Sequence, residues 1–231
     1  MAENYDSKRA WCDLYQTVDQ IAYPAEAVIR IFKGSFPNLS LPKNYDGANI
    51  LDIGYGDGRH FPLFESIGLS CYGVEIDEHI VKLTQQRLEN FSIAAKLSVG
   101  SAARLHFPNE FFDYVIAWNS SYYMSLDNLT YEDHVSEMLR VLKPGGNIII
   151  SVPSYTGFVF EKAEMLDNDY AIIRNDFFGA RNGEVMRRFR NIEDLRSSFD
   201  GFLKDQAHAE IKMDWFGLNY HWLVLVGSKG K

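Results

Sequence analysis

Short apolar runs alternate with segments of helical spacing along most of the chain. The runs predict strands, at residues 49–51, 69–74, 95–99, 112–118 and 147–152. Asp77 is expected to cap a helix whose apolar residues recur at helical spacing through Leu88. Residues 129–142 predict a further helix that ends at the Lys143-Pro144-Gly145-Gly146 turn. Strands that alternate with helices indicate an α/β fold with a mostly parallel sheet and helices on both faces.

The two ends of the chain depart from this alternation. An amphipathic segment spans residues 7–36, and Pro24 is well placed to start its second helix at residues 25–32. Near the other end, residues 211–215 and 221–226 predict an antiparallel strand pair that closes the sheet.

The most informative segment is the turn after the first strand. Asp52 is followed by glycines at 54, 56 and 58, and Glu75 lies at the carboxyl end of the second strand, seventeen residues after the last glycine. Residues 59–67 predict a short helix, stopped by Gly68. Glycines allow the backbone to turn tightly and approach a ligand, and an acid at this spacing binds the two hydroxyls of a ribose. The segment therefore predicts a site for a nucleoside cofactor.

The identity of that cofactor depends on two details. A dinucleotide fingerprint requires glycine at position 59, where this chain has Arg59. Asp52 cannot favour a pyrophosphate, but its carboxylate can order the glycine loop and, through water, an ammonium group. S-adenosylmethionine carries an ammonium, a ribose diol and an adenine, and it has no phosphate.

Residues 45–152 resemble the class I (Rossmann-like) S-adenosylmethionine-dependent methyltransferases. The resemblance rests on the Asp-x-Gly-x-Gly-x-Gly segment, the strand at residues 111–119 and the Arg140–Gly146 turn. It implies a seven-stranded, mostly parallel sheet with an antiparallel last strand pair. We expect one domain over residues 1–231, divided into a helical cap (1–44), the cofactor-binding core (45–152), a crossover with a lid insertion (153–208) and the closing strand pair (209–231).

The resemblance also implies a set of residues that bind S-adenosylmethionine. Ser101 stands where the family has an aspartate near the adenine, and its hydroxyl is a weaker acceptor than a carboxylate. Asn119 is expected to line the methionine end. The full set is Asp52, Gly54, Gly56, Gly58, Arg59, Glu75, Ile76, Ser101, Ala102 and Asn119.

No catalytic base stands out in the sequence. Tyr122 and His134 are the candidates, each weighed against a purely structural role in packing. His60, His106 and His221 are equally undecided. Because the six histidines and two cysteines include no pair at metal-ligand spacing, we expect no metal.

Composition and net charge indicate which partners and which cellular compartment to expect. The 231 residues carry a net charge of −8, which argues against a general affinity for nucleic acid or anionic membrane. Residues 1–6 are polar and acidic and predict no signal peptide, and no apolar run approaches eighteen residues. With only Cys12 and Cys71, we expect a cytoplasmic protein with reduced thiols.

The stretch between the predicted strands at residues 147–152 and 211–215 is longer than one connecting helix needs. Residues 158–189 of this stretch are expected to lie over the site as a lid. The basic residues of this stretch are Arg174, Arg181, Arg187, Arg188, Arg190 and Arg196. They favour an acceptor with a carboxylate or phosphate, unless they form ion pairs with the nearby acids Asp176, Glu184, Glu193 and Asp194. Trp11, Tyr15 and Tyr23 of the amino-terminal segment are candidates for the opposite wall, with core packing as the alternative.

The resulting functional prediction is methyl transfer from S-adenosylmethionine to an oxygen or nitrogen of a small molecule. A degenerate fold that binds the cofactor without catalysis, or acts as an interaction protein, is the alternative from another class. A nicotinamide oxidoreductase is the third, and Arg59 and Asp52 argue against it.

Overall fold

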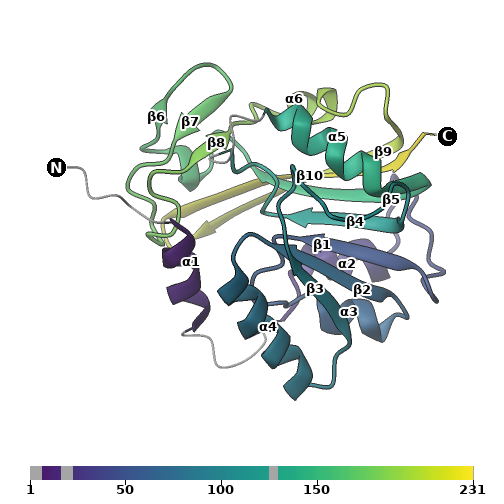
Figure 1. The fold of residues 1–231 in the computed structure, drawn as a ribbon. Coiled ribbons are helices and arrows are strands. Elements are labelled where there is room, and N and C mark those ends of the chain that lie inside the picture. Colours follow the sequence, from purple (N-terminus) through teal and green to yellow (C-terminus); the bar gives the residue numbers. More distant parts are fainter. Residues whose placement is uncertain (1–6, 17–22, 125–129, 231) are drawn as a thin grey trace.

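The central sheet has seven strands in the order β3-β2-β1-β4-β5-β10-β9 (Figure 1). The structure is a computed structural model, and it describes residues 7–16, 23–124 and 130–230. The strands are β1 Asn49–Ile53, β2 Ser70–Glu75, β3 Ala95–Val99, β4 Phe112–Trp118, β5 Leu142–Pro153, β9 Leu203–Trp215 and β10 Leu218–Lys229. β10 pairs antiparallel with both β5 and β9, and the other neighbours are parallel. The predicted fold class is confirmed.

Helices cover both faces of this sheet, as the alternation predicted (Figure 1). Along β4 the side chains alternate: Tyr114 and Ile116 belong to one apolar cluster, whereas Val115 and Ala117 belong to the other. The first cluster includes side chains of α2 (Glu26–Lys33), α3 (Phe61–Ser66) and α4 (Glu78–Asn90). The second includes side chains of α5 (Tyr131–Val141) and α6 (Ile192–Ser197). Strands buried on both faces explain the nearly continuous apolar runs in the sequence.

The predicted helix boundaries hold where the signal is local. Asp77 caps α4 by accepting hydrogen bonds from the N–H groups of His79 and Ile80. Gly68 adopts φ +89 after α3, the left-handed conformation that ends a helix. α5 begins at Tyr131, and Leu129, where the helix was expected to start, lies outside the described residues.

The closing strand pair is longer than the sequence indicated. β9 begins at Leu203 and β10 runs to Lys229, so the pair extends well beyond residues 211–215 and 221–226. Much of β9 alternates between polar and small residues on a sheet edge that is largely exposed, and such a strand has no apolar run to reveal it.

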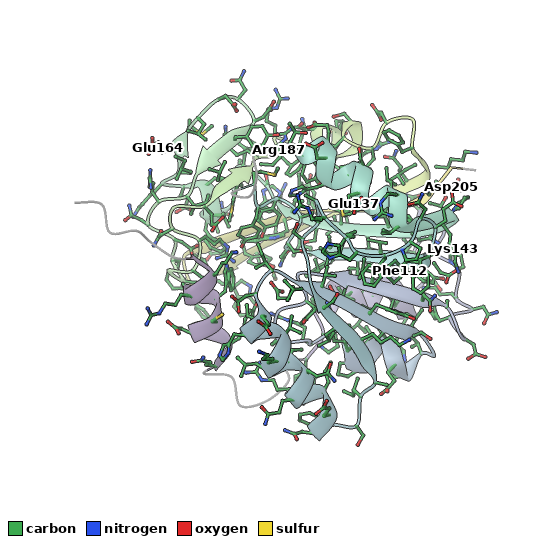
Figure 2. All side chains as sticks on the ribbon, in the orientation of Figure 1. Phe112, Glu137, Lys143, Glu164, Arg187 and Asp205 are labelled. Atoms are coloured by element: carbon green, nitrogen blue, oxygen red, sulfur yellow. The ribbon has the colours of Figure 1, made fainter. Side chains whose placement is uncertain are left out.

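The insertion between β5 and α6 forms a small antiparallel sheet of β6 (Glu164–Met165), β7 (Tyr170–Ile172) and β8 (Val185–Arg187). In Figure 2, Phe112 and Lys143 lie near the starts of β4 and β5, whereas Glu164 of the insertion lies on the opposite side of the molecule. The insertion and α1 (Ser7–Gln16) therefore flank the end of the sheet at which the parallel strands finish.

Candidate functional site

A cavity of about 320 Å³ opens at the carboxyl ends of the parallel strands. It is lined by residues at or just after the ends of β1, β2, β3 and β4, together with residues of α1, α5 and the insertion. These are Lys8, Trp11, Tyr15, Ile53, Gly54, Glu75, Ile76, Gly100, Ser101, Ala102, Ala103, Asn119, Ser120, Tyr123, His134 and Glu184. A larger hollow of about 660 Å³ lies beside residues 154–156 and the β9–β10 pair, and it includes none of the glycine-loop residues.

The glycine loop is shaped by close approaches that a side chain would prevent. Gly54 has φ +66, and a Cβ added there would clash with the Cβ of Ser120 at the end of β4. Gly56 has φ +56, and a Cβ there would clash with the hydroxyl of Tyr15 on α1. Two segments distant in sequence therefore pack directly onto the backbone of this loop, and this requires glycine.

Glu75 holds the loop from the neighbouring strand. Its Oε2 accepts a hydrogen bond from the Gly56 N–H at 3.1 Å, and its Oε1 accepts one from its neighbour Ile76 at 3.0 Å. Burial raises the pKa of the Glu75 carboxyl, and the two N–H donors oppose that rise. Each oxygen keeps a lone pair for a further donor, as the binding of a ribose diol requires.

The end of β4 has the strained backbone typical of functional sites. Asn119 adopts φ +59, and its Oδ1 accepts a hydrogen bond from the Ser151 hydroxyl at 2.5 Å. The Ser120 hydroxyl donates to the Ile53 carbonyl oxygen at 2.5 Å and so joins the ends of β4 and β1. Both Asn119 and Ser120 line the cavity beside Gly54.

The structure brings together six of the ten predicted cofactor residues at the cavity surface: Gly54, Glu75, Ile76, Ser101, Ala102 and Asn119. Asp52 does not line it, because its carboxylate is buried against His60, with Oδ2 3.0 Å from Nδ1. Arg59 contacts Asp57 rather than the cavity, with Nε 3.3 Å from Oδ1. A Cβ on Gly58 would meet Thr84 of α4 at 2.7 Å, so this glycine permits close packing between loop and helix.

The two catalytic candidates differ in position. Tyr122 is fully buried among the side chains of the core and does not line the cavity. Its neighbour Tyr123 does line it, with the two rings stacked at 4.9 Å. His134 of α5 also lines the cavity, and its Nδ1 lies 2.7 Å from the Ser121 carbonyl oxygen. Burial lowers the pKa of the His134 imidazole.

α1 supplies the opposite wall with Lys8, Trp11 and Tyr15. The Cys12 thiol donates to Asp77 Oδ1 at 3.3 Å, and the Tyr15 carbonyl oxygen accepts from Arg87, so α1 is bound to both ends of α4. Trp11 and Tyr15 were expected here, whereas Tyr23 is 92% exposed and does not line the cavity. Lys8 and Glu184 were not expected in the site. Lys8 lies on the polar surface of α1, and Glu184 lies in a loop without any motif.

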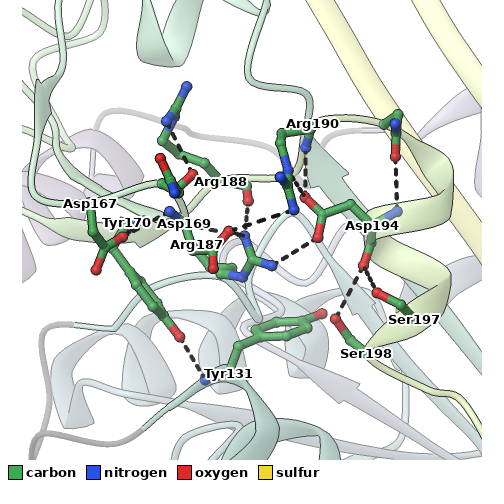
Figure 3. Close-up of polar contacts among 12 residues, drawn as sticks. Tyr131, Asp167, Asp169, Tyr170, Arg187, Arg188, Arg190, Asp194, Ser197 and Ser198 are labelled. Carbon is green, nitrogen blue, oxygen red and sulfur yellow. Dashed lines mark hydrogen bonds and ion pairs between the residues drawn. The ribbon is translucent and has the colours of Figure 1, made fainter.

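The arginines of the insertion are engaged in structural contacts. Figure 3 shows Asp194 of α6 accepting hydrogen bonds from Arg187 and Arg190, while Arg187 also contacts Asp169. Arg174 pairs with Glu164, and Arg181 pairs with the buried Asp176 at 3.0 Å. No arginine of this segment lines the described cavity. Four of the six arginines therefore form ion pairs, and Arg188 and Arg196 donate hydrogen bonds to Asn168 and Gln206 instead.

S-adenosylmethionine fits the groups that the structure places in the cavity. Ser101 and Ala102 offer a wall at the end of β3, Glu75 offers a carboxylate at the end of β2, and Gly54 with Asn119 offers backbone and amide groups. No phosphate-binding cation lies on the glycine loop, because Arg59 is turned to Asp57. Within the described residues, no helix could span a membrane, and no His, Cys, Asp and Glu side chains are grouped as metal ligands.

Known proteins share both this segment and this fold. Residues 50–146 match the family model described as a methyltransferase domain. The ubiquinone/menaquinone biosynthesis C-methyltransferase of Bordetella parapertussis is 32% identical over 108 residues, which are 45% of this chain and 40% of that protein. The match therefore spans less than half of that curated relative.

Two solved structures extend the likeness to nearly the whole chain. The PH0226 protein from Pyrococcus horikoshii superposes with a TM-score of 0.66 at 18% identity and covers 94% of this chain and 98% of its own. The 1,6-didemethyltoxoflavin-N1-methyltransferase of Burkholderia thailandensis, solved with S-adenosylhomocysteine, gives 0.60 at 18% identity and covers 95% of this chain and 82% of its own. The sequence match identifies residues 50–146 as a methyltransferase domain, and the fold shared with these solved structures agrees with the class I family that the glycine-rich motif predicted.

Proposed function

We propose that this protein transfers a methyl group from S-adenosylmethionine to an oxygen or nitrogen atom of a small molecule. The observation that carries the proposal is the continuity of the cavity, in which Glu75 and Ser101 share one space with Trp11, Tyr123 and His134. The first pair belongs to the cofactor motif. The second group has no part in that motif and forms walls that suit an acceptor.

When bound, the cofactor supplies an activated methyl group on sulfonium. Glu75 binds the ribose hydroxyls, and Ser101 with Ala102 lines the adenine position. Gly54 and Asn119 hold the methionine end, and Asp52 supports the loop from behind through His60. Tyr15 and Trp11 of α1 cover the site and exclude water, so catalysis rests largely on positioning.

The aromatic walls favour a small, flat acceptor. Trp11 and Tyr15 stack with ring centroids 5.8 Å apart, and Tyr123 lines the same cavity. The Burkholderia relative is named for N1-methylation of a small molecule, and the Bordetella relative for C-methylation. A carbon acceptor is therefore the alternative within the same class. An anionic acceptor loses its main support, since the insertion arginines are paired elsewhere, although Lys8 lines the cavity.

Binding of the cofactor tests the proposal directly. Calorimetry should show that S-adenosylmethionine and S-adenosylhomocysteine bind, whereas NADH does not. Glu75→Gln should weaken binding of both sulfur ligands by about 1–3 kcal/mol, because the ribose loses a charged acceptor. Glu78→Gln is the matched control: Glu78 is an exposed acid that pairs with Lys82, and its replacement should leave the affinity unchanged.

The alternative of a degenerate fold makes a different prediction. Binding of S-adenosylhomocysteine without transfer of labelled methyl to any of a broad set of small oxygen, nitrogen and carbon acceptors would favour a non-catalytic binding protein. Loss of both binding and transfer would refute the cofactor assignment. We propose a cytoplasmic location, supported by the two buried cysteines, which are free thiols.

A further inference from the structure

The hydrogen bond of His134 fixes the tautomer of its ring. Nδ1 lies 2.7 Å from the backbone carbonyl oxygen of Ser121, and a carbonyl oxygen can only accept. Nδ1 therefore carries the proton, and in the neutral ring Nε2 presents a lone pair. Ser121 lies two residues after Asn119, so this histidine is anchored to the segment that lines the methionine end of the cavity.

The other nitrogen of His134 differs from the corresponding atom in two other histidines, His60 and His221. Nε2 of His60 and Nε2 of His221 are sealed from solvent without a hydrogen-bond partner. Nε2 of His134 is not among the sealed atoms, and within the described part of the chain no donor contacts it. Although the residue is only 6% exposed, it lines the cavity. Nε2 is therefore the nitrogen of His134 that remains available to a ligand in the cavity.

The surroundings of His134 suit an uncharged aromatic ligand. Its ring lies 6.3 Å from the Tyr131 ring, and Trp11 and Tyr123 line the same cavity. The titratable groups that face the same space are Lys8, Tyr15, Glu75, Tyr123 and Glu184, and Asp133 adjoins His134 on its own helix. Asp133 favours the protonated imidazole, and burial favours the neutral ring more strongly.

We propose that His134 is the general base of the reaction and that the acceptor is a hydroxyl group on a planar, conjugated ring. This inference rests on the proposed methyl transfer and deepens it. An acceptor that is already ionised, such as a carboxylate, would need no base, and a tertiary amine would have no proton to lose. A hydroxyl on a flat ring fits both the lone pair of Nε2 and the aromatic walls.

The step balances without any further reactant. Nε2 of His134 takes the hydroxyl proton as the oxygen forms a bond to the methyl carbon. The bond between that carbon and sulfur breaks, and its electron pair returns to sulfur, which leaves neutral S-adenosylhomocysteine. The imidazolium then releases its proton to water, and Nδ1 stays bonded to Ser121 throughout.

The tautomer can be tested without turnover. In the full chain labelled with 15N-histidine and saturated with S-adenosylhomocysteine, the His134 signal is assigned by its loss in His134→Asn. We expect a protonated Nδ1 and an unprotonated Nε2 at pH 7.5, with Nε2 shifting when 4-methoxyphenol is added. A proton on Nε2, or an Nε2 signal that no phenol perturbs, would overturn the proposal.

Kinetics supply the second readout. Asparagine at position 134 can still donate to the Ser121 carbonyl oxygen but offers no base, so His134→Asn should bind S-adenosylhomocysteine with unchanged affinity. Its transfer to 4-methoxyphenol should fall about 10²–10⁴-fold, with a much smaller loss for the readily ionised 4-nitrophenol. His106→Asn, at an exposed histidine, should keep the wild-type rate.

The outcomes of these experiments distinguish the role of His134 and the acceptor class from the cofactor assignment. Equal losses for both phenols, or none, would overturn the role of His134. Wild-type protein that binds S-adenosylhomocysteine yet methylates no phenol would overturn the acceptor class while the cofactor assignment stands. Absence of S-adenosylhomocysteine binding by the wild type would instead refute the proposed function itself.

Discussion

Asp52 and His60 form a buried pair in which the carboxylate Oδ2 lies 3.0 Å from the imidazole Nδ1. Asp52 is 1% exposed and His60 is 4% exposed, and no other described side chain bonds to either. The pair joins the end of β1 to the start of α3, on either side of the glycine loop. The acid that begins the cofactor motif therefore holds the loop from within the protein, and it does not line the cavity.

Breaking this pair should cost substantial stability. His60→Ala leaves the Asp52 carboxylate buried without its partner, and we expect the free energy of unfolding to fall by about 3–5 kcal/mol. Urea denaturation measures the change. His106→Ala, at an exposed histidine, should alter it by less than about 0.5 kcal/mol. If the two variants are equally stable, the pair is not structural.

The contact between Gly56 and Tyr15 should couple the glycine loop to α1. Gly56→Ala adds a Cβ that clashes with the Tyr15 hydroxyl, at a backbone φ of +56. We expect weaker binding of S-adenosylhomocysteine together with loss of stability. Gly145→Ala isolates the backbone effect, because Gly145 has φ +78 and open space around it, and should cost about 1–2 kcal/mol.

A double-mutant cycle with Tyr15→Ala then measures the contact itself. Removing the ring should recover part of the Gly56→Ala loss, with a coupling energy of at least about 0.5 kcal/mol. Strict additivity of the two substitutions would show that α1 does not press on the loop in solution.

Arg181 should hold the insertion against α1. Its guanidinium pairs with Asp176, whose side chain is fully buried, and lies 5.2 Å from the centre of the Trp11 ring. Arg181→Met leaves the Asp176 charge uncompensated and should destabilise this region by about 3–5 kcal/mol. Limited chymotrypsin digestion should then cut faster at Phe177 and Phe178, which are 71% and 52% exposed.

Arg174→Met is the matched control for that experiment. Arg174 pairs with Glu164 at 2.8 Å, but both side chains are about half exposed, so the pair contributes at most about 1 kcal/mol. Equal digestion rates in the two variants would contradict a special role for Arg181.

Stability should fall as the pH drops below about 6.5. Burial lowers the pKa values of His134 and His221 from their ordinary value of 6.5, so the unfolded chain binds more protons than the folded chain just below that pH. Stability therefore rises with pH from the lowered values up to 6.5. The acids with lowered pKa, such as Asp77 and Asp194, act in a separate window below 3.8.

His134→Asn isolates the contribution of one histidine. The raised pKa of the Glu75 carboxyl makes its contribution to stability fall as the pH rises. Glu75 is present in both proteins, so this contribution cancels in the comparison. Urea denaturation at pH 7.5 and 5.5 should show a smaller loss for the variant than for the wild type. An identical loss would mean that His134 already titrates normally in the folded protein.

The sequence by itself determined the features that depend on neighbouring residues. β3 and β4 occur at the predicted residues 95–99 and 112–118. β4 is buried on both faces and therefore leaves an apolar run, whereas β3 lies at the edge of the sheet and is only partly buried. The glycine loop and Glu75 are encoded within one stretch of β1, α3 and β2, and the pairing of β1 with β2 brings them together. Periodicity and local spacing were therefore enough for the fold class and for six of the residues that line the cavity.

Only the tertiary structure decided the roles that depend on partners distant in the chain. The sequence left open whether the insertion arginines face a ligand, and their ion pairs with Asp176 and Asp194 settle that they do not line the cavity. It offered Tyr122 as a catalytic candidate, although Tyr122 is sealed in the core and its neighbour Tyr123 lines the cavity. It also gave no sign that the Ser121 carbonyl oxygen would accept a hydrogen bond from Nδ1 of His134. Side-chain direction and hydrogen-bond partners arise when elements pack, and packing joins residues that no local pattern relates.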